Sequence, residues 1–143
     1  MNMDIKHTGL ETSAYSETVS IPATSCLTYV SGILPDISDI DAAPGTTSAY
    51  GDTKTQTISV FEKICKILKN NNLSMGDIIQ IRVFLVGTAA LDGKLDFSGF
   101  QQGYNKFFGT SDQPNKPTRT AVQVVALPLP GTLVEVDVIA VGR

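Results

Sequence analysis

The chain has 143 residues, of which 42% are hydrophobic and 17% are charged, and its net charge at pH 7 is −3. These proportions suit one globular domain over residues 1–143 and exclude an intrinsically disordered chain. The negative charge disfavours nucleic acid as a partner, because phosphate backbones attract basic surfaces. No apolar run approaches the roughly 18 residues of a membrane span. The polar N-terminus lacks the apolar core of a secretory signal, so we expect a cytoplasmic protein.

Cysteine usage argues against a metal site. Cys26 and Cys65 are too far apart in the sequence to form a CxxC pair. In a chain without a secretory signal we expect two buried thiols, although the sequence leaves a disulfide open. One histidine and two separated cysteines do not make a zinc site, so no metal is expected.

The first predicted elements are strands. Residues 26–32 have the aromatic and β-branched composition of a strand that ends at a turn. A shorter strand within residues 17–21 is expected to pair with it. Residues 34–52 are rich in Pro, Gly, Asp and Ser, which predicts a long surface connection. Connections of this length are often functional or mobile.

Two helices and a buried strand follow. Residues 53–69 form the clearest helix, because apolar side chains recur at three- and four-residue steps and Asp52 or Thr53 can cap its start. Residues 77–86 read as a strand that is buried on much of both faces. A second helix is predicted over residues 96–108, where an aromatic stripe indicates core packing. The stripe consists of Phe97, Phe100, Tyr104 and Phe107 or Phe108.

Two strands end the chain, over residues 119–127 and 132–141, with a Pro- and Gly-rich break at residues 128–131. The order β-β-α-β-α-β-β predicts an α+β domain with two helices on one face of a mixed sheet. The other face would be rich in Val and Ile. We expect a partner subunit to cover it.

Two side chains in these strands could carry chemistry. The guanidinium of Arg119 could bind a carboxylate through two hydrogen bonds, although the residue could also be a surface arginine at a sheet end. Glu135 lies between Val134 and Val136, where a carboxylate must be paired, hydrogen-bonded or functional. A solvent-exposed strand face, or a structural salt bridge to a basic residue, would equally explain a glutamate at this position.

The spacing of these two residues does not suit a site within one chain. If residues 128–131 made a simple hairpin turn, Glu135 would face a residue near Val124, and Arg119 would lie roughly 17 Å away. Either the two strands are not a simple hairpin, or Arg119 and Glu135 meet across a subunit boundary.

Few other residues suggest a site. Tyr15 and Ser31 could each donate a hydrogen bond to a ligand oxygen, although each is more often structural. The one histidine, His7, is close to the N-terminus, where we expect a mobile chain and no role in a site. The sequence holds no nucleophile elbow, phosphate-binding glycine loop or metal-ligand cluster.

Short motifs, in order along nearly the whole chain, resemble the RidA/YjgF family, also labelled endoribonuclease L-PSP. The C-terminal block is the most specific of them. It comprises Pro-Thr-Arg-Thr-Ala-Val at residues 117–122, Leu-Pro at 127–128 and Val-Glu-Val at 134–136. The earlier motifs are Ala14-Tyr15-Ser16, Tyr29-Val30-Ser31-Gly32, Thr55-Gln56-Thr57, and Tyr104 with Phe107-Phe108.

The resemblance implies a chorismate-mutase-like α+β fold, a homotrimer and three clefts between subunits. It implies hydrolysis of reactive 2-imino or enamino acids to 2-keto acids and ammonia, without a metal or organic cofactor. Arg119 would bind the substrate carboxylate, and Glu135 would orient or activate the attacking water. The substrate-binding positions would be Tyr15, Ser31, Gly32, Gln101 and Ala121, with Gly32 and Ala121 contributing backbone groups.

The chain departs from the family pattern near these positions. Ala121 stands where cysteine is common, Gln101 stands in place of asparagine, and Ile33 stands in place of glutamine. A backbone role at residue 121 survives the change, whereas a thiol role does not. The carboxylate anchor is intact, and the substrate side-chain preference stays open.

Two other functions compete with imine hydrolysis. Metal-free RNA cleavage, which the endoribonuclease label suggests, most simply needs a pair of histidines, and this chain has one. Alternatively, the clefts could bind a small carboxylate or a partner protein without turnover. Three outcomes distinguish these functions. Turnover of an imino acid indicates the deaminase, binding without turnover indicates the binding protein, and metal-independent RNA cleavage indicates the nuclease.

Overall fold

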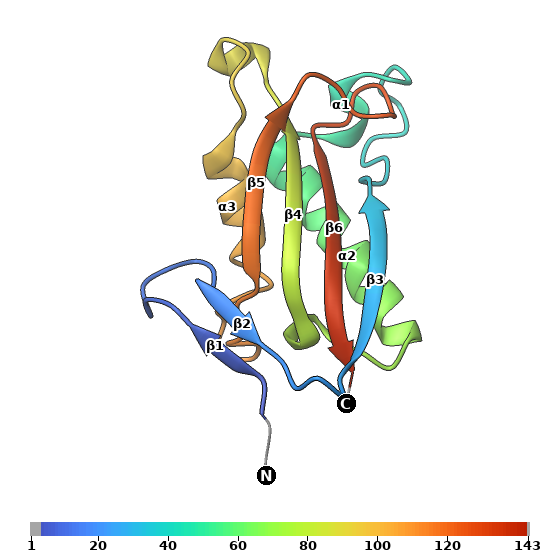
Figure 1. The fold of residues 1–143 in the computed structure, drawn as a ribbon. Helices are drawn as coiled ribbons and strands as arrows, with labels where there is room; N and C mark the ends of the chain where they lie inside the picture. The colour runs from blue at the N-terminus through green and yellow to red at the C-terminus, as the bar shows by residue number, and fades with distance from the viewer. Residues whose placement is uncertain (1–3, 143) are drawn as a thin grey trace.

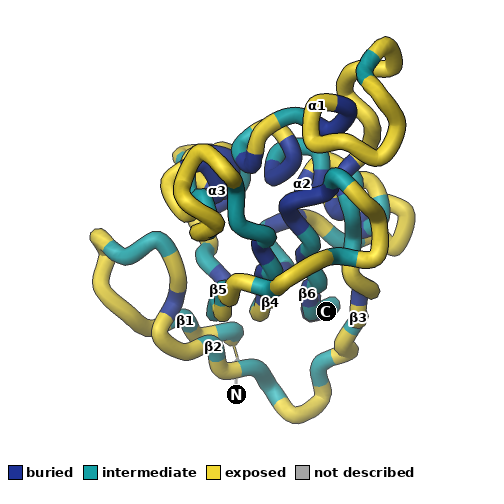
Figure 2. Tube along the Cα trace, turned by 90° about the horizontal axis from the view of Figure 1, so that it is seen from above, coloured by how far each residue is buried: buried dark blue, intermediate teal, exposed yellow. Residues whose placement is uncertain are grey.

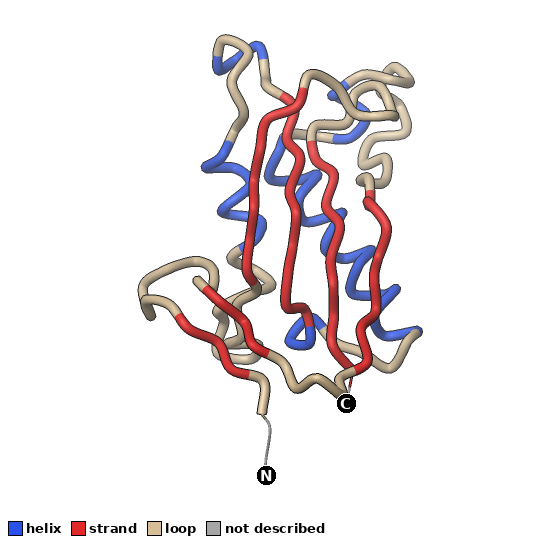
Figure 3. Tube along the Cα trace, viewed as in Figure 1, coloured by secondary structure: helices blue, strands red, loops and turns tan. Residues whose placement is uncertain are grey.

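The computed structural model of the protein describes residues 4–142. A small N-terminal hairpin lies beside a four-stranded sheet that is backed by helices (Figures 1 and 3). In chain order the elements are β1 (Lys6–Thr8), β2 (Thr18–Ser20), β3 (Cys26–Ile33), α1 (Thr47–Tyr50), α2 (Thr53–Asn70), the 3-10 turn η1 (Met75–Asp77), β4 (Ile78–Val86), the 3-10 turn η2 (Ala89–Leu91), α3 (Phe97–Tyr104), β5 (Thr118–Val124) and β6 (Val134–Gly142).

The strand order of the main sheet is β3-β6-β4-β5. Strand β6 is antiparallel to both of its neighbours, whereas β4 and β5 are parallel. The sheet is therefore mixed, as the sequence predicts. Strands β5 and β6 follow each other in the chain, yet β4 lies between them. They are therefore not a simple hairpin, which was the first of the two alternatives that the spacing of Arg119 and Glu135 left open.

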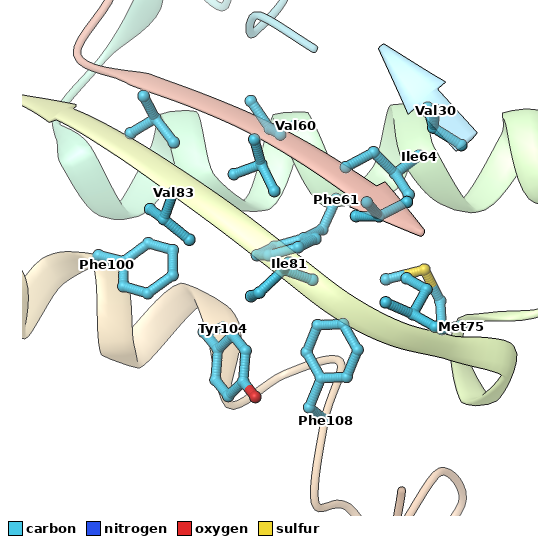
Figure 4. Close-up of a cluster of buried hydrophobic side chains, with 14 of the residues drawn as sticks. Val30, Val60, Phe61, Ile64, Met75, Ile81, Val83, Phe100, Tyr104 and Phe108 are labelled. Carbon is cyan, nitrogen blue, oxygen red and sulfur yellow. The ribbon is translucent and has the colours of Figure 1, made fainter. Parts of the chain in front are cut away.

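Helices α2 and α3 pack on one side of this sheet, which we call the helix face (Figure 2). Strand side chains alternate between the two sides, so Ile81, Val83 and Leu85 of β4 point to the helices and are fully buried. They meet Phe61 and Ile64 from α2 (Figure 4). This apolar layer holds α3, and with it the residues around Arg119, in a fixed place against the sheet.

Figure 1 looks onto the other side of the sheet, which we call the bare face. No element of residues 4–142 covers the middle of it. Large apolar side chains are exposed there, with Leu27 40%, Tyr29 70% and Val122 41% exposed. Arg82 of β4 donates through Nε and Nη2 to the Asp137 carboxylate of β6 on the same face. A bare apolar face with a few charges agrees with the expectation from the sequence.

The N-terminal strands differ from the prediction. The short strand expected within residues 17–21 is β2, but it pairs with β1 and not with β3. The hydroxyls of Thr8 and Thr18 bond across this hairpin, and the Glu17 amide donates to the Thr8 carbonyl. Strand β1 escapes prediction because three residues, with a histidine between Lys6 and Thr8, carry no apolar alternation.

Two other predictions need adjustment, and one is confirmed. The second helix, expected over residues 96–108, ends at Tyr104, because the amides of Phe107 and Phe108 turn back to the Tyr104 carbonyl. The connection over residues 34–52 contains the short helix α1, with Ala49 and Tyr50 buried. Helix α2 begins where expected, because the Asp52 carboxylate accepts a hydrogen bond from the Thr55 amide.

The cysteines are free, but the expectation that they are buried is wrong, since both are exposed. Cys65 follows the buried Ile64 on the outer side of α2, and Cys26 begins β3, a strand at the edge of the sheet. None of the helices in residues 4–142 is long and apolar enough to cross a lipid bilayer.

Replacing Phe61 with alanine is expected to lower the free energy of unfolding by about 3–5 kcal/mol. Phe61 is 0% exposed and its ring contacts Tyr104, Phe107 and Phe108. The matched control is Phe97→Ala, because Phe97 is 43% exposed and should cost less. Urea unfolding at a single protein concentration measures both, since association would add to the stability. Equal losses for the two variants would contradict the packing described.

Candidate functional site

Arg119 lies where strand β5 begins, on the helix face of the sheet. Its partner in the register is Ile81, which points to the helices. The guanidinium therefore extends between the sheet and α3, and the N-terminal loop of residues 9–17 closes the third side. Figure 1 shows β5 starting at the lower end of the sheet, next to the hairpin β1–β2.

Four aromatic rings surround this guanidinium. Because they lie within about 6 Å of the charge, their π-faces offset part of the cost of taking the cation out of water. Burial lowers the pKa of Arg119, while Tyr104 and Tyr15 oppose that shift, and the residue stays charged at neutral pH. The distances from Cζ to the ring centroids are 4.6 Å for Tyr104, 4.9 Å for Tyr15, 5.5 Å for Phe97 and 5.6 Å for Phe100.

The guanidinium keeps hydrogen-bonding capacity to spare. Its Nη1 donates to Oε1 of Gln101 at 2.9 Å. Within residues 4–142 it has no ion-pair partner, because the two salt bridges there join Lys63 to Asp36 and Arg82 to Asp137. A half-buried arginine with five donors and no carboxylate partner is suited to bind an anion from outside the chain.

The N-terminal loop, residues 9–17, is fastened to the segment that leads into β5. The Nζ of Lys116 donates to the carbonyls of Glu11 and Ser13, at 2.8 and 2.6 Å. The Tyr104 hydroxyl donates to the Ala14 carbonyl at 2.8 Å, and burial raises the pKa of that hydroxyl. These bonds hold Tyr15 against Arg119. Sequence reasoning missed Lys116, for which no local pattern gives a signal.

His7 has a structural place rather than the mobile one expected from the sequence. Its Nδ1 lies 2.9 Å from the Lys116 carbonyl and 3.2 Å from Oγ of Ser16. The Ser16 hydroxyl also donates to that carbonyl. The ring therefore helps to fasten the N-terminal loop.

Within residues 4–142 no three His, Cys, Asp or Glu side chains converge as metal ligands.

Glu135 lies at the start of β6, on the bare face. Strand β3 has a bulge beside it, between Val30 and Ile33, and Gly32 in that bulge packs directly against the Glu135 carboxylate. A Cβ atom at residue 32 would overlap the carboxylate, so any other residue there would displace the Glu135 side chain. Ser31 is exposed in the same bulge. The Glu135 carboxylate therefore lies beside the bulge that contains Ser31 and Gly32.

The structure does not bring Glu135 together with Arg119 inside one chain. Arg119 pairs with Ile81 and Glu135 pairs with Phe84, so the two Cα atoms are three residues and two strand spacings apart, or about 14 Å. Their side chains also leave the sheet on opposite faces. Any site that uses both residues needs two chains.

The remaining predicted positions lie with Arg119. Gln101 bonds it directly, Tyr15 stacks on it, and Ala121 lies two residues further along β5 on the same face, paired with Val83. A hollow of about 310 Å³ borders this group, with Gln101, Asn105 and Lys116 among its lining residues. Asn105 was not predicted, although its spacing of four residues from Gln101 on a helix was a usable signal.

Comparison with known proteins shows the family of the chain. The profile of the family described as Endoribonuclease L-PSP matches residues 9–142. The chain belongs to this family. A RutC family protein of Pyrococcus abyssi is 34% identical over 112 residues, which is 78% of this chain and 76% of the relative. Relatives and structural neighbours with RutC and Rid names place the chain in the RidA/YjgF family.

Solved structures of the family share the fold. The Rid protein YyfB of Yersinia pestis, described as of unknown function, superposes with a TM-score of 0.69 at 16% identity, covering 96% of this chain and 98% of its own. TdcF of Escherichia coli, crystallised with bound serine, gives a TM-score of 0.63 at 25% identity, covering 96% and 99%. TdcF is provisionally named a reactive intermediate deaminase and is 31% identical to this chain over 115 residues. The fold is the chorismate-mutase-like α+β fold.

Proposed function

We propose that the protein hydrolyses small 2-imino or enamino acids to 2-keto acids and ammonia, with Arg119 binding the substrate carboxylate. The observation that carries this proposal is the half-buried guanidinium of Arg119, which is surrounded by aromatic rings and has no carboxylate partner in residues 4–142. A free carboxylate is the substrate group that would complete it. The relative TdcF, with its bound serine, supports a small amino-acid-derived substrate.

The chemistry requires water as the second reactant. Water adds to the imine carbon, a proton moves to the nitrogen, and the tetrahedral intermediate releases ammonia as the keto group forms. Glu135 would accept the proton from water and return it to the leaving nitrogen, as a general base and acid. Ser31, the Gly32 backbone and the Ala121 backbone would line the pocket. Both Arg119 and Tyr15 would hold the carboxylate, which is bonded to the reacting carbon.

The proposal includes a homotrimer with sites between subunits. Arg119 and Glu135 lie on opposite faces of one sheet, so a shared site needs the helix-face group of one chain and the bare-face group of the next. The exposed side chains of Leu27, Tyr29 and Val122 support burial of the bare face by further copies of the chain.

A cytoplasmic location also stays a prediction, which cell fractionation would check.

The direct test generates a transient imine in place with an amino-acid oxidase or a serine/threonine dehydratase. Keto-acid and ammonia release are followed with and without the protein, whose mass is measured by light scattering. Acceleration by a trimer would support the proposal. A folded trimer that binds a small carboxylate without accelerating release would instead indicate a binding protein, and a folded protein that does neither would contradict the proposal.

RNA cleavage is the weaker candidate. The family description names an endoribonuclease, but the only histidine of the chain, His7, is hydrogen-bonded to the backbone of Lys116 and to Ser16. It therefore lacks the partner histidine that metal-free cleavage most simply uses. Metal-independent cleavage of RNA by purified protein, lost in a purified variant, would favour the nuclease.

Gln101→Glu is expected to raise KM for the imino acid at least about tenfold, because the new carboxylate would pair with Arg119 at the position of the amide oxygen. The substrate carboxylate would then compete with a fixed one. Gln102→Glu is the matched control, since it adds the same charge to the next, exposed residue of α3. A wild-type KM for Gln101→Glu in steady-state assays would show that Arg119 is not the anchor.

A further inference from the structure

The amide of Gln101 has only one useful orientation beside Arg119. A guanidinium is a pure donor, so the amide must turn its oxygen toward Arg119, as it does at 2.9 Å. With the amide reversed, its NH₂ group would face a cation and both groups would lose a hydrogen bond. An amide on an accessible side chain reverses easily unless its nitrogen has an acceptor of its own.

Asn105 supplies that acceptor. The Nε2 of Gln101 donates to Oδ1 of Asn105 at 2.7 Å. Asn105 is the first residue after α3 and its backbone is still helical, with φ −63° and ψ −14°. Residues four apart on a helix lie on the same side, which places both amides in line with Arg119. Asn105 is exposed, and its side chain does not bond Arg119 itself.

The two kinds of contact restrain the guanidinium in complementary ways. The aromatic rings, with centroids 4.6 to 5.6 Å from Cζ, limit where the planar group can lie. A single directional hydrogen bond from Nη1 fixes its rotation within that space. Without a fixed amide oxygen, the remaining N–H groups would have no set direction, and a substrate carboxylate would have to order them on binding.

We propose that Asn105 is a positioning residue: it fixes the Gln101 amide, and through it the direction in which Arg119 presents its free donors to a carboxylate. The proposal rests on the proposed role of Arg119 as the carboxylate anchor, and it adds a residue that does not touch the substrate. An anchor that is already ordered loses less conformational entropy when the substrate binds. Removing Asn105 should therefore raise KM more than it lowers kcat.

Helix α3 offers a matched control. The Nε2 of Gln102 donates to Oγ of Ser98 at 3.3 Å, which is a contact between an amide and a side chain four residues away on the same helix. Gln102 is exposed, and its side chain forms this hydrogen bond and none to Arg119 within residues 4–142. Gln102→Ala therefore removes a comparable surface hydrogen bond of α3 without reaching the anchor.

The kinetic test compares Asn105→Ala, Asn105→Asp and Gln102→Ala with wild type. Asn105→Ala should raise KM for the imino acid about five- to tenfold while kcat changes less than about twofold. Asn105→Asp keeps an oxygen acceptor for Gln101 and should restore most of the wild-type KM, and Gln102→Ala should match wild type. An unchanged KM in Asn105→Ala, or an equal rise in Asn105→Asp, would overturn the proposal.

A second readout needs no substrate. The NMR resonance of the Arg119 Nε–H group, assigned by its loss in Arg119→Lys, should shift or broaden in Asn105→Ala and stay unchanged in Gln102→Ala. If it does so while the wild-type protein hydrolyses no imine, the positioning role stands and the proposed function fails. If the resonance is the same in Asn105→Ala and wild type, Asn105 does not position Arg119, whatever the activity.

Discussion

Replacing Arg119 with alanine is expected to lower kcat/KM for imine hydrolysis by about a hundredfold to a thousandfold. Two charge-assisted hydrogen bonds to a carboxylate would be lost, which together are worth roughly 3–4 kcal/mol. Because Gln101 is the one hydrogen-bond partner of the guanidinium in residues 4–142, the change leaves no buried carboxylate unpaired. The fold should therefore survive.

Arg119→Lys separates charge from geometry. Lysine keeps the positive charge but is a point donor without a planar fork, so we expect an intermediate loss. Steady-state kinetics on the generated imine, with thermal unfolding as a check of folding, measure both variants. Wild-type kcat/KM in a folded Arg119→Ala protein would remove Arg119 from the site and contradict the proposed function.

Glu135→Gln is expected to lower kcat by about a hundredfold to ten thousandfold. Glutamine has nearly the same shape as glutamate, so it fits against Gly32, but it cannot take a proton from water. The change should leave KM close to the wild-type value, in contrast to changes at Gln101, because Glu135 would act on water and not on the substrate carboxylate. A wild-type kcat in Glu135→Gln would exclude it as the base.

Mixing the two inactive variants tests where the site lies. In a trimer refolded from equal amounts of Arg119→Ala and Glu135→Gln chains, a site built from two neighbouring chains is complete about one time in four, so about a quarter of wild-type activity should return. Variants refolded separately and then mixed without subunit exchange should stay inactive. A co-refolded mixture that also stays inactive would contradict a site shared between chains.

Local patterns predicted the elements that carry their own signals. Helix α2 follows from the apolar spacing that ends at Leu68 and from the Asp52 cap, and both are present. The strands β3, β4, β5 and β6 follow from β-branched runs. The exposed Cys65 was misplaced because hydrophobic character alone does not say which of two adjacent residues, Ile64 or Cys65, faces the sheet.

The arrangement of the site depends on contacts that no local pattern reports. The insertion of β4 between β5 and β6 sets the separation of Arg119 and Glu135, and the register of both strands on β4 puts the two side chains on opposite faces. Strand order and register are properties of the whole sheet. The aromatic stripe of α3 was correctly assigned to the core at Phe100 and Tyr104. Its second role, around the Arg119 guanidinium, appears only when β5 and α3 are packed together.

The fastening of residues 9–17 by Lys116 has a practical consequence for protein engineering. A chain cut just before β3 would keep all four strands of the main sheet and the helices α2 and α3. It would nevertheless lose Tyr15, one of the four rings around the Arg119 guanidinium, and the two carbonyls that Lys116 binds. If Arg119 is the proposed anchor, a cleavage site or fusion junction placed in residues 9–17 would disturb the surroundings of its guanidinium while the strands and helices of the main sheet stay in the chain.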